Sequence, residues 1–122
     1  MKKILFIEDD PILQKTFGET VKEKGHELSS VFSGEAGFEA AKTEKPDLIL
    51  LDLVLPKMHG FEVLKKLKAD QDTKDIPVIV LTNLEGTGEI EKALELGATT
   101  YLLKAQYTLK ELAEKIKTIL GE

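Results

Sequence analysis

Residues 48–52 of the chain are Leu-Ile-Leu-Leu-Asp, four consecutive apolar side chains followed by an aspartate. A short apolar run without alternation is typical of a strand buried on both faces, as in a parallel sheet covered by helices. Three further runs follow the same pattern, and a polar residue ends each of them: residues 4–7 before Glu8, 78–81 before Thr82, and 101–103 before Lys104. The repetition predicts parallel strands whose carboxyl ends carry polar groups.

A fifth strand is expected over residues 27–31, where Ser29 and Ser30 favour an edge position. Amphipathic segments between the strands predict helices. The first helix is expected to begin at Pro11, after the cap Asp10, and to end before Gly25. We expect the others over residues 33–43, 60–69 and 89–96, and after Thr108, which would form a capping box with Glu111.

This alternation of strands and helices predicts an α/β fold, a doubly wound parallel sheet of five strands with helices on both faces. In such sheets ligands bind outside the carboxyl ends of the strands, where the winding direction reverses. The polar residues after the apolar runs fall at that edge. The sequence therefore predicts where a functional site lies before it indicates the chemistry.

Composition narrows the function classes. The 122 residues suit one domain, 1–122, and we expect no effector domain. All 17 basic residues are lysine and the net charge is −5, which argues against direct nucleic-acid binding. There is no cysteine, and the N-terminal apolar run is too short for a signal peptide or membrane insertion. We expect a cytoplasmic protein.

Each polar residue alone has an ordinary structural explanation: a turn, a helix cap or an exposed lysine. Together they form a chemical set. Carboxylates of Glu8, Asp9 and Asp52 would repel one another without a cation, and Mg²⁺ prefers such oxygen ligands. Asp52 can act as a nucleophile toward a phosphoryl group, while Thr82 and Lys104 can bind the phosphoryl oxygens. The residue types suffice for an aspartyl phosphate.

Four motifs carry a resemblance across essentially the whole chain: IEDDP at 7–11, LLDLVLPKMHG at 50–60, VLTN at 80–83 and TYLLK at 100–104. In this order they resemble the receiver domain of bacterial response regulators, which act in two-component phosphorelay signal transduction. The resemblance implies a flavodoxin-like sandwich with strand order 2-1-3-4-5. It also implies a phosphoprotein, with Asp52 as the phosphoacceptor.

Further roles follow from the resemblance. Mg²⁺, for which Mn²⁺ could substitute, would be bound by Glu8, Asp9, Asp52 and the backbone carbonyl of Val54. Thr82 and Tyr101 would form the conformational switch. The phosphodonor would be a sensor histidine kinase, a histidine phosphotransfer protein or a small phosphodonor. The fourth helix, last strand and last helix would contact a target protein or a second copy. The domain would assist its own phosphorylation and dephosphorylation without being an enzyme.

Several positions depart from the family pattern. Ala105 replaces a proline that is usually in cis linkage to the lysine. Because a non-proline cis bond costs about 2.5 to 4 kcal/mol, a trans Lys104–Ala105 bond is the alternative expected here. Asn83 is larger than usual and would restrict access to the site. Val54 and Leu84 are apolar where the family tunes hydrolysis of its aspartyl phosphate, which predicts slow decay. His59 replaces Asp or Asn, and we interpret it as a loop residue; we expect His26 at the surface.

Two other functions remain open on the sequence. A degenerate receiver would serve only as a protein-interaction module, and Asn83 and Ala105 favour it. A haloacid-dehalogenase-like phosphohydrolase would need a second aspartate two positions after the nucleophile, where this chain has Val54. Flavodoxin-like nucleotide binding fits less well, because acidic residues would repel a flavin phosphate.

Overall fold

The computed structural model describes residues 2–82, 88–104 and 108–121. Strands and helices alternate along it, as predicted. The strands are β1 (Lys3–Ile7), β2 (Glu27–Val31), β3 (Leu48–Asp52), β4 (Val78–Thr82) and β5 (Thr100–Leu103). The helices are α1 (Pro11–Glu23), α2 (Gly34–Glu44), α3 (Gly60–Ala69), α4 (Gly88–Glu95) and α5 (Leu109–Leu120).

The strands form one parallel sheet in the order β2-β1-β3-β4-β5. The predicted fold class and strand order are confirmed, and β2 lies at an edge as expected. The register places Asp52 opposite Leu81 and Thr82 opposite Leu103. The carboxyl ends of the central strands are therefore aligned at one edge of the sheet, where the winding direction reverses between β1 and β3.

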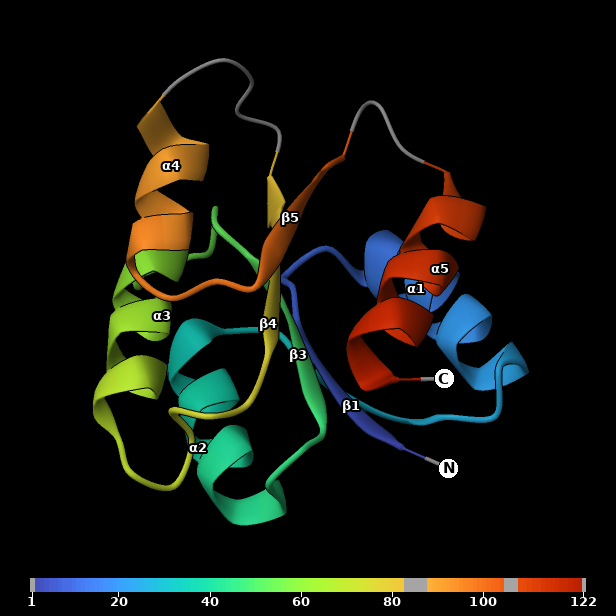
Figure 1. The fold of residues 1–122 in the computed structure, drawn as a ribbon, viewed down its shortest axis with the longest axis horizontal. Coiled ribbons are helices and arrows are strands. Elements are labelled where there is room, and N and C mark those ends of the chain that lie inside the picture. Colours follow the sequence, from blue (N-terminus) through green and yellow to red (C-terminus); the bar gives the residue numbers. More distant parts are fainter. Residues whose placement is uncertain (1, 83–87, 105–107, 122) are drawn as a thin grey trace.

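Helices cover both faces of the sheet (Figure 1). α1 and α5 pack on one face, where Phe17, Val21, Leu112 and Ile116 contact alternate strand residues. α2, α3 and α4 cover the other face, chiefly through aromatic and aliphatic side chains of α3. Every residue of β3 and β4 is buried. This burial explains why their apolar runs show no alternation.

The predicted helix ends hold to within a residue or two. Asp10 caps α1, because its Oδ1 accepts a hydrogen bond from the Ile12 backbone N–H at 2.8 Å. Thr108 caps α5 through the N–H of Glu111. Gly25 has φ +86°, a conformation that ends a helix readily only at glycine. α2 begins after the cap Ser33 rather than at it.

Of the two histidines, His26 contradicts the expectation, while His59 lies in the loop before α3 as expected. His26 was predicted at the surface but is buried beside the C-terminal end of α1. His59 caps α3: its Nδ1 accepts a hydrogen bond from Phe61 N–H at 3.0 Å. This role explains why a residue with a polar acceptor precedes Gly60. None of the described helices combines the length and apolar content that a membrane span requires.

Candidate functional site

The acidic residues after β1 form a tight turn in which each carboxylate has a different environment. The side chain of Asp10 caps α1. Its backbone N–H donates to Oε2 of Glu8 at 3.1 Å, which holds the Glu8 carboxylate close to the turn. Glu8 is buried and Asp9 is exposed. The turn thus presents one buried and one accessible carboxylate at the end of β1.

Asp52 is the last residue of β3, and only 3% of its surface is exposed. Its Oδ1 accepts a hydrogen bond from the Val54 backbone N–H at 3.2 Å. The other oxygen, Oδ2, lies 3.0 Å from Nζ of Lys104. Both interactions fix the carboxylate at the carboxyl end of β3, which is the central strand of the sheet.

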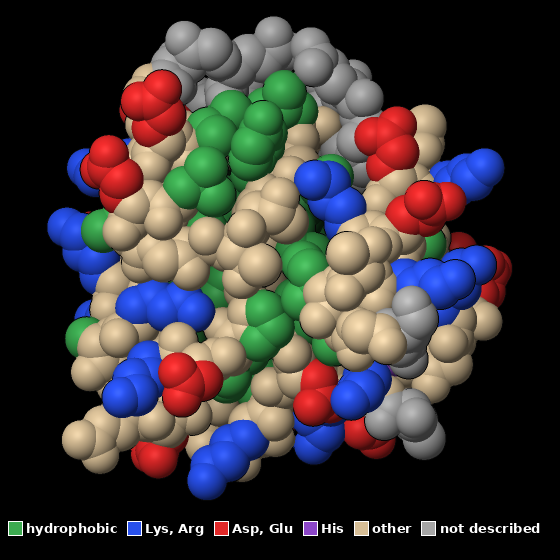
Figure 2. Space-filling model, in the orientation of Figure 1, with side chains coloured by type: hydrophobic (Ala, Val, Ile, Leu, Met, Phe, Trp, Pro, Cys, Tyr) green, Lys and Arg blue, Asp and Glu red, His purple; other side chains and the backbone are tan. Residues whose placement is uncertain are grey.

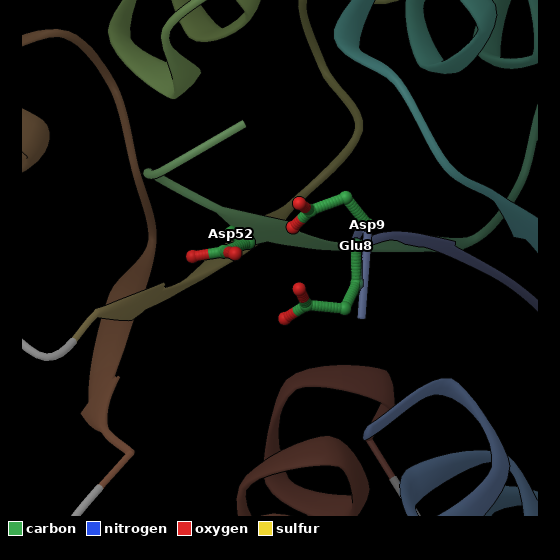
Figure 3. Close-up of side chains that lie close together, drawn as sticks. All are labelled: Glu8, Asp9 and Asp52. Carbon is green, nitrogen blue, oxygen red and sulfur yellow. The ribbon is translucent and has the colours of Figure 1, made fainter. Parts of the chain in front are cut away.

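The structure brings together the three carboxylates among the four predicted metal ligands. Glu8, Asp9 and Asp52 each contribute a carboxylate oxygen, and these oxygens lie within 4.8 Å of one another. Figure 3 shows Glu8 and Asp9, which follow β1, beside Asp52 at the end of β3. The two strands are neighbours in the sheet although Glu8 and Asp52 are far apart in sequence.

Lys104 follows β5 and reaches across the sheet edge to this cluster. Its Nζ lies 2.8 Å from Oε1 of Glu8 and 3.0 Å from Oδ2 of Asp52. The lysine side chain is 13% exposed. Its backbone N–H donates to the carbonyl of Thr82 at 2.8 Å, which ties the end of β5 to the end of β4. One ammonium therefore bridges two buried carboxylates.

Burial and neighbouring charges shift the pKa values of Glu8 and Lys104. Burial is the main cause that raises the pKa of Glu8, from 4.5 to about 7; the Lys104 ammonium opposes the rise and the Asp52 carboxylate adds to it. For Lys104, burial acts to lower the pKa, but its bonds to Glu8 and Asp52 outweigh this and raise the pKa. The lysine therefore stays charged, while Glu8 holds a proton more strongly than an exposed glutamate.

The donor set fits a hard divalent cation. If all three carboxylates are ionised, the single ammonium leaves two negative charges uncompensated, which is the charge that Mg²⁺ would balance. Oxygen ligands from one or two carboxylates and a solvent-accessible side satisfy its coordination preferences, and Asp9 is exposed. Glu8, Asp9 and Asp52 are the residues that would hold the ion.

Thr82 and Val54 flank the cluster as predicted, and their roles stay predictions. Thr82 is the last residue of β4 and is fully buried. Val54 lies two residues after Asp52, bonds to its carboxylate through the backbone N–H, and has a 57% exposed surface. The positions are compatible with a hydroxyl that turns toward a phosphoryl group and with a carbonyl that binds a metal.

Tyr101 lies on β5, partly buried against the core cluster formed by α2, α3 and α4. The Nζ of Lys115 in α5 lies 5.9 Å from the centre of its ring. Tyr101 is thus a partly buried residue of an edge strand of the sheet. Its switch role stays a prediction.

Three predicted positions fall outside the described residues: Asn83, Leu84 and Ala105. The restricted access attributed to Asn83, the role of Leu84 in hydrolysis and the geometry of the bond after Lys104 stay predictions for this reason.

Two features of the site were missed in the sequence. Lys104 was expected at the same edge of the sheet as the carboxylates, but its pairing with Glu8, 96 positions away in sequence, has no local signal. Gln14, whose side chain binds the carbonyl of Glu8, left a weak signal. It shares the buried stripe of α1 with Phe17, Gly18 and Val21, so it is a polar residue at an apolar position.

The chain matches a known protein family over most of its length. The family model described as the response regulator receiver domain matches residues 4–117. The chain is 33% identical over 121 residues to the polar-differentiation response regulator DivK of Brucella ovis, covering 99% of this chain and 98% of that one. It is 34% identical over 120 residues to RpaA of Synechocystis, a DNA-binding dual master transcriptional regulator.

The chain spans only part of some relatives. It covers 49% of RpaA and 15% of a gliding motility regulatory protein of Myxococcus xanthus, to which it is 33% identical over 93% of its own length. Among solved structures, the receiver domain of the Pseudomonas aeruginosa sensor histidine kinase PA1611 matches with a TM-score of 0.90 and 26% identity, covering 99% of this chain and 98% of that one. That crystal structure holds a magnesium ion in the active-site cleft.

Proposed function

Because the chain belongs to the family of response regulator receiver domains, we propose that it accepts a phosphoryl group on Asp52 in a Mg²⁺-dependent reaction. The observation that carries the proposal is the convergence of Glu8, Asp9 and Asp52, with Lys104 bonded to two of them. The donor is a phosphohistidine on a sensor kinase or phosphotransfer protein, or a small phosphodonor.

The chemistry requires a nucleophile and charges that stabilise the transferring group. An oxygen of Asp52 attacks phosphorus; the P–N bond of the phosphohistidine breaks, and the imidazole nitrogen keeps the bonding electrons and takes a proton. Lys104 is already positioned at the nucleophile and can bind a phosphoryl oxygen after transfer. Thr82 supplies a hydroxyl. A bound Mg²⁺ would neutralise the carboxylates and the phosphoryl oxygens.

The phosphorylated state is proposed to signal through α4, β5 and α5, with Thr82 and Tyr101 as the switch. Figure 2 shows hydrophobic side chains gathered on the side of the molecule that presents these elements. Exposed Leu94 of α4 supports the proposal of a protein contact there. The partner is a target protein or a second copy of the chain, and the site of action is the cytoplasm.

Phosphotransfer makes the domain a phosphoacceptor and not a turnover enzyme. The alternative of a pure interaction module has no need for Lys104 bridging two carboxylates. The haloacid-dehalogenase-like alternative lacks its second aspartate, because the exposed side chain two residues after Asp52 is that of Val54.

Incubation with Mg²⁺ and a small phosphodonor, followed by intact mass measurement, tests the function. The wild type should gain the mass of one phosphoryl group, and Asp52→Asn should not. Asp10→Asn is the matched control, since asparagine also caps helices and Asp10 is not among the metal ligands. An unmodified wild type would favour the interaction module, and release of phosphate with turnover would favour the phosphohydrolase.

The lifetime of the phosphorylated form depends on whether a side chain can orient water near Asp52. Val54 is exposed and apolar, so it cannot hydrogen-bond an attacking water. We expect Val54→Asn to speed loss of the phosphoryl group severalfold. Leu94→Asn on α4 serves as the control for an added surface amide. Equal decay rates for Val54→Asn and wild type would count against this tuning role.

A further inference from the structure

Gln14 is a polar residue on the buried stripe of α1, with 5% of its surface exposed. Buried polar side chains are normally retained only where they find hydrogen-bond partners. The contacts of Gln14 all lead to the backbone near the acidic turn after β1.

The side-chain Nε2 carries two N–H groups and lies within hydrogen-bond distance of three carbonyl oxygens, so one N–H is shared between two of them. They belong to Phe6 at 3.1 Å, Glu8 at 3.1 Å and Val31 at 2.9 Å. The backbone N–H of Gln14 also donates to the carbonyl of Asp10 at 3.0 Å. One residue of α1 thus ties together the ends of β1 and β2 and bonds to the carbonyls on both sides of Asp9.

The carboxamide oxygen of Gln14, Oε1, unlike its nitrogen, is buried without a hydrogen-bond partner among the described residues. Reversing the amide would place this oxygen against the three carbonyls, so the orientation is set by the donors. An unsatisfied buried acceptor is a cost that proteins usually avoid. Its presence here indicates that the donor contacts to the turn matter.

The remaining contacts of the turn point the same way. Glu8 N–H donates to the Val31 carbonyl at 3.1 Å, the same oxygen that Gln14 binds. Asp10 N–H donates to the Glu8 carboxylate. Gln14 therefore closes a network that fixes the backbone from which the Glu8 and Asp9 side chains project toward Asp52 (Figure 3).

We propose that Gln14 is a positioning residue of the metal site, whose carboxamide holds the turn so that the carboxylates of Glu8 and Asp9 face Asp52. This inference rests on the proposed Mg²⁺ site. Gln14 does not contact the ion. It acts through the backbone that carries Glu8 and Asp9, two of the proposed ligands. Mutation of groups that hold metal ligands in place typically lowers metal affinity by about 10 to 100-fold.

The test compares Mg²⁺ affinity, measured by calorimetric titration with Mg²⁺ alone, in the wild type and Gln14→Met. Methionine has a similar length and packs in the core but cannot donate to the carbonyls. We expect the Kd for Mg²⁺ to rise by about 10-fold or more. Gln14→Asn, one methylene shorter, should also weaken binding and serves if Gln14→Met does not fold.

Thr73→Val separates positioning from general destabilisation. Thr73 is also buried, and its Oγ1 donates to the Leu67 carbonyl at 2.6 Å in the connection that leads into the opposite end of β4. This variant should lower thermal stability but keep the wild-type Kd. A Gln14 variant with the same Kd as wild type overturns the inference and leaves the proposed function standing. A wild type that binds no Mg²⁺ overturns both.

Discussion

At the scale of single residues, Glu8 sets the charge balance of the site. It is buried, pairs with Lys104 and lies beside Asp52. Burial raises its pKa to about 7, so the folded protein holds this proton more tightly than the unfolded chain does. Protonation of Glu8 would reduce the repulsion among the three acids, and its raised pKa favours the protonated form.

This shift predicts a dependence of stability on pH in the presence of a chelator. A folded-state pKa raised above the unfolded value of 4.5 gives a stabilising contribution that is complete below pH 4.5 and is lost as the pH rises through about 7. The contribution is on the order of 3 kcal/mol. Chemical denaturation across this range should show the free energy of unfolding of wild type falling relative to Glu8→Gln.

Glu8→Gln is the control because its amide cannot titrate. Subtracting the free energy of unfolding of Glu8→Gln from that of wild type at each pH removes the pH dependence that the two proteins share. Parallel pH profiles for wild type and Glu8→Gln would show that Glu8 does not hold the proton.

Lys57 marks a strained position in the loop between β3 and α3. It is exposed and has φ +66°, in the left-handed region that side chains other than glycine rarely adopt. Lys57→Gly should raise the free energy of unfolding by roughly 0.5 to 1 kcal/mol, because the strain removed exceeds the added entropy of the unfolded chain. Thermal or chemical denaturation measures the change.

Lys65→Gly provides the opposite case, since Lys65 is exposed within α3 and has helical backbone geometry. It should lower stability by about 1 kcal/mol. Destabilisation of both variants by the same amount would remove the argument from backbone strain.

At the scale of elements, the acidic turn depends on how closely α2 approaches β1. A Cβ built on Gly37 of α2 would lie 2.5 Å from Cδ1 of Ile7, the buried residue directly before Glu8. Gly37→Ala should therefore destabilise the protein by roughly 1 to 3 kcal/mol despite the better helix propensity of alanine.

Gly88→Ala is the matched variant, because a Cβ on Gly88 in the first turn of α4 meets no atom of the described residues within 4 Å. It should be neutral or stabilising in the same denaturation experiment. If Gly37→Ala were as stable as Gly88→Ala, the contact between α2 and β1 would be looser than described.

The elements show what a sequence can predict. The strands and the caps Asp10 and Thr108 were predicted because their signals are local: an apolar run, or a capping residue before an amphipathic segment. The burial of His26 was not predicted, because it depends on how the end of α1 packs in the fold. Pairing of Lys104 with Glu8 likewise depends on strand order.

At the scale of the whole molecule, the sheet order makes one site from residues spread over most of the chain. β1 and β3 are neighbours at the point where the winding reverses, so the acids after β1 meet Asp52 of β3. β4 and β5 bring Thr82 and Lys104 to the same edge. The spacing of polar residues after apolar runs predicted this convergence, since parallel strands share the direction of their carboxyl ends.

The central claim is that Asp52 carries the phosphoryl group. An acyl phosphate is reduced by borohydride to an alcohol, which would leave homoserine at position 52 in the protein treated with phosphodonor. Peptide mass mapping should find this change at Asp52 when Mg²⁺ is present and not when it is chelated. Homoserine at another aspartate, the corresponding alcohol at a glutamate, or no conversion with Mg²⁺ and phosphodonor present would contradict the account.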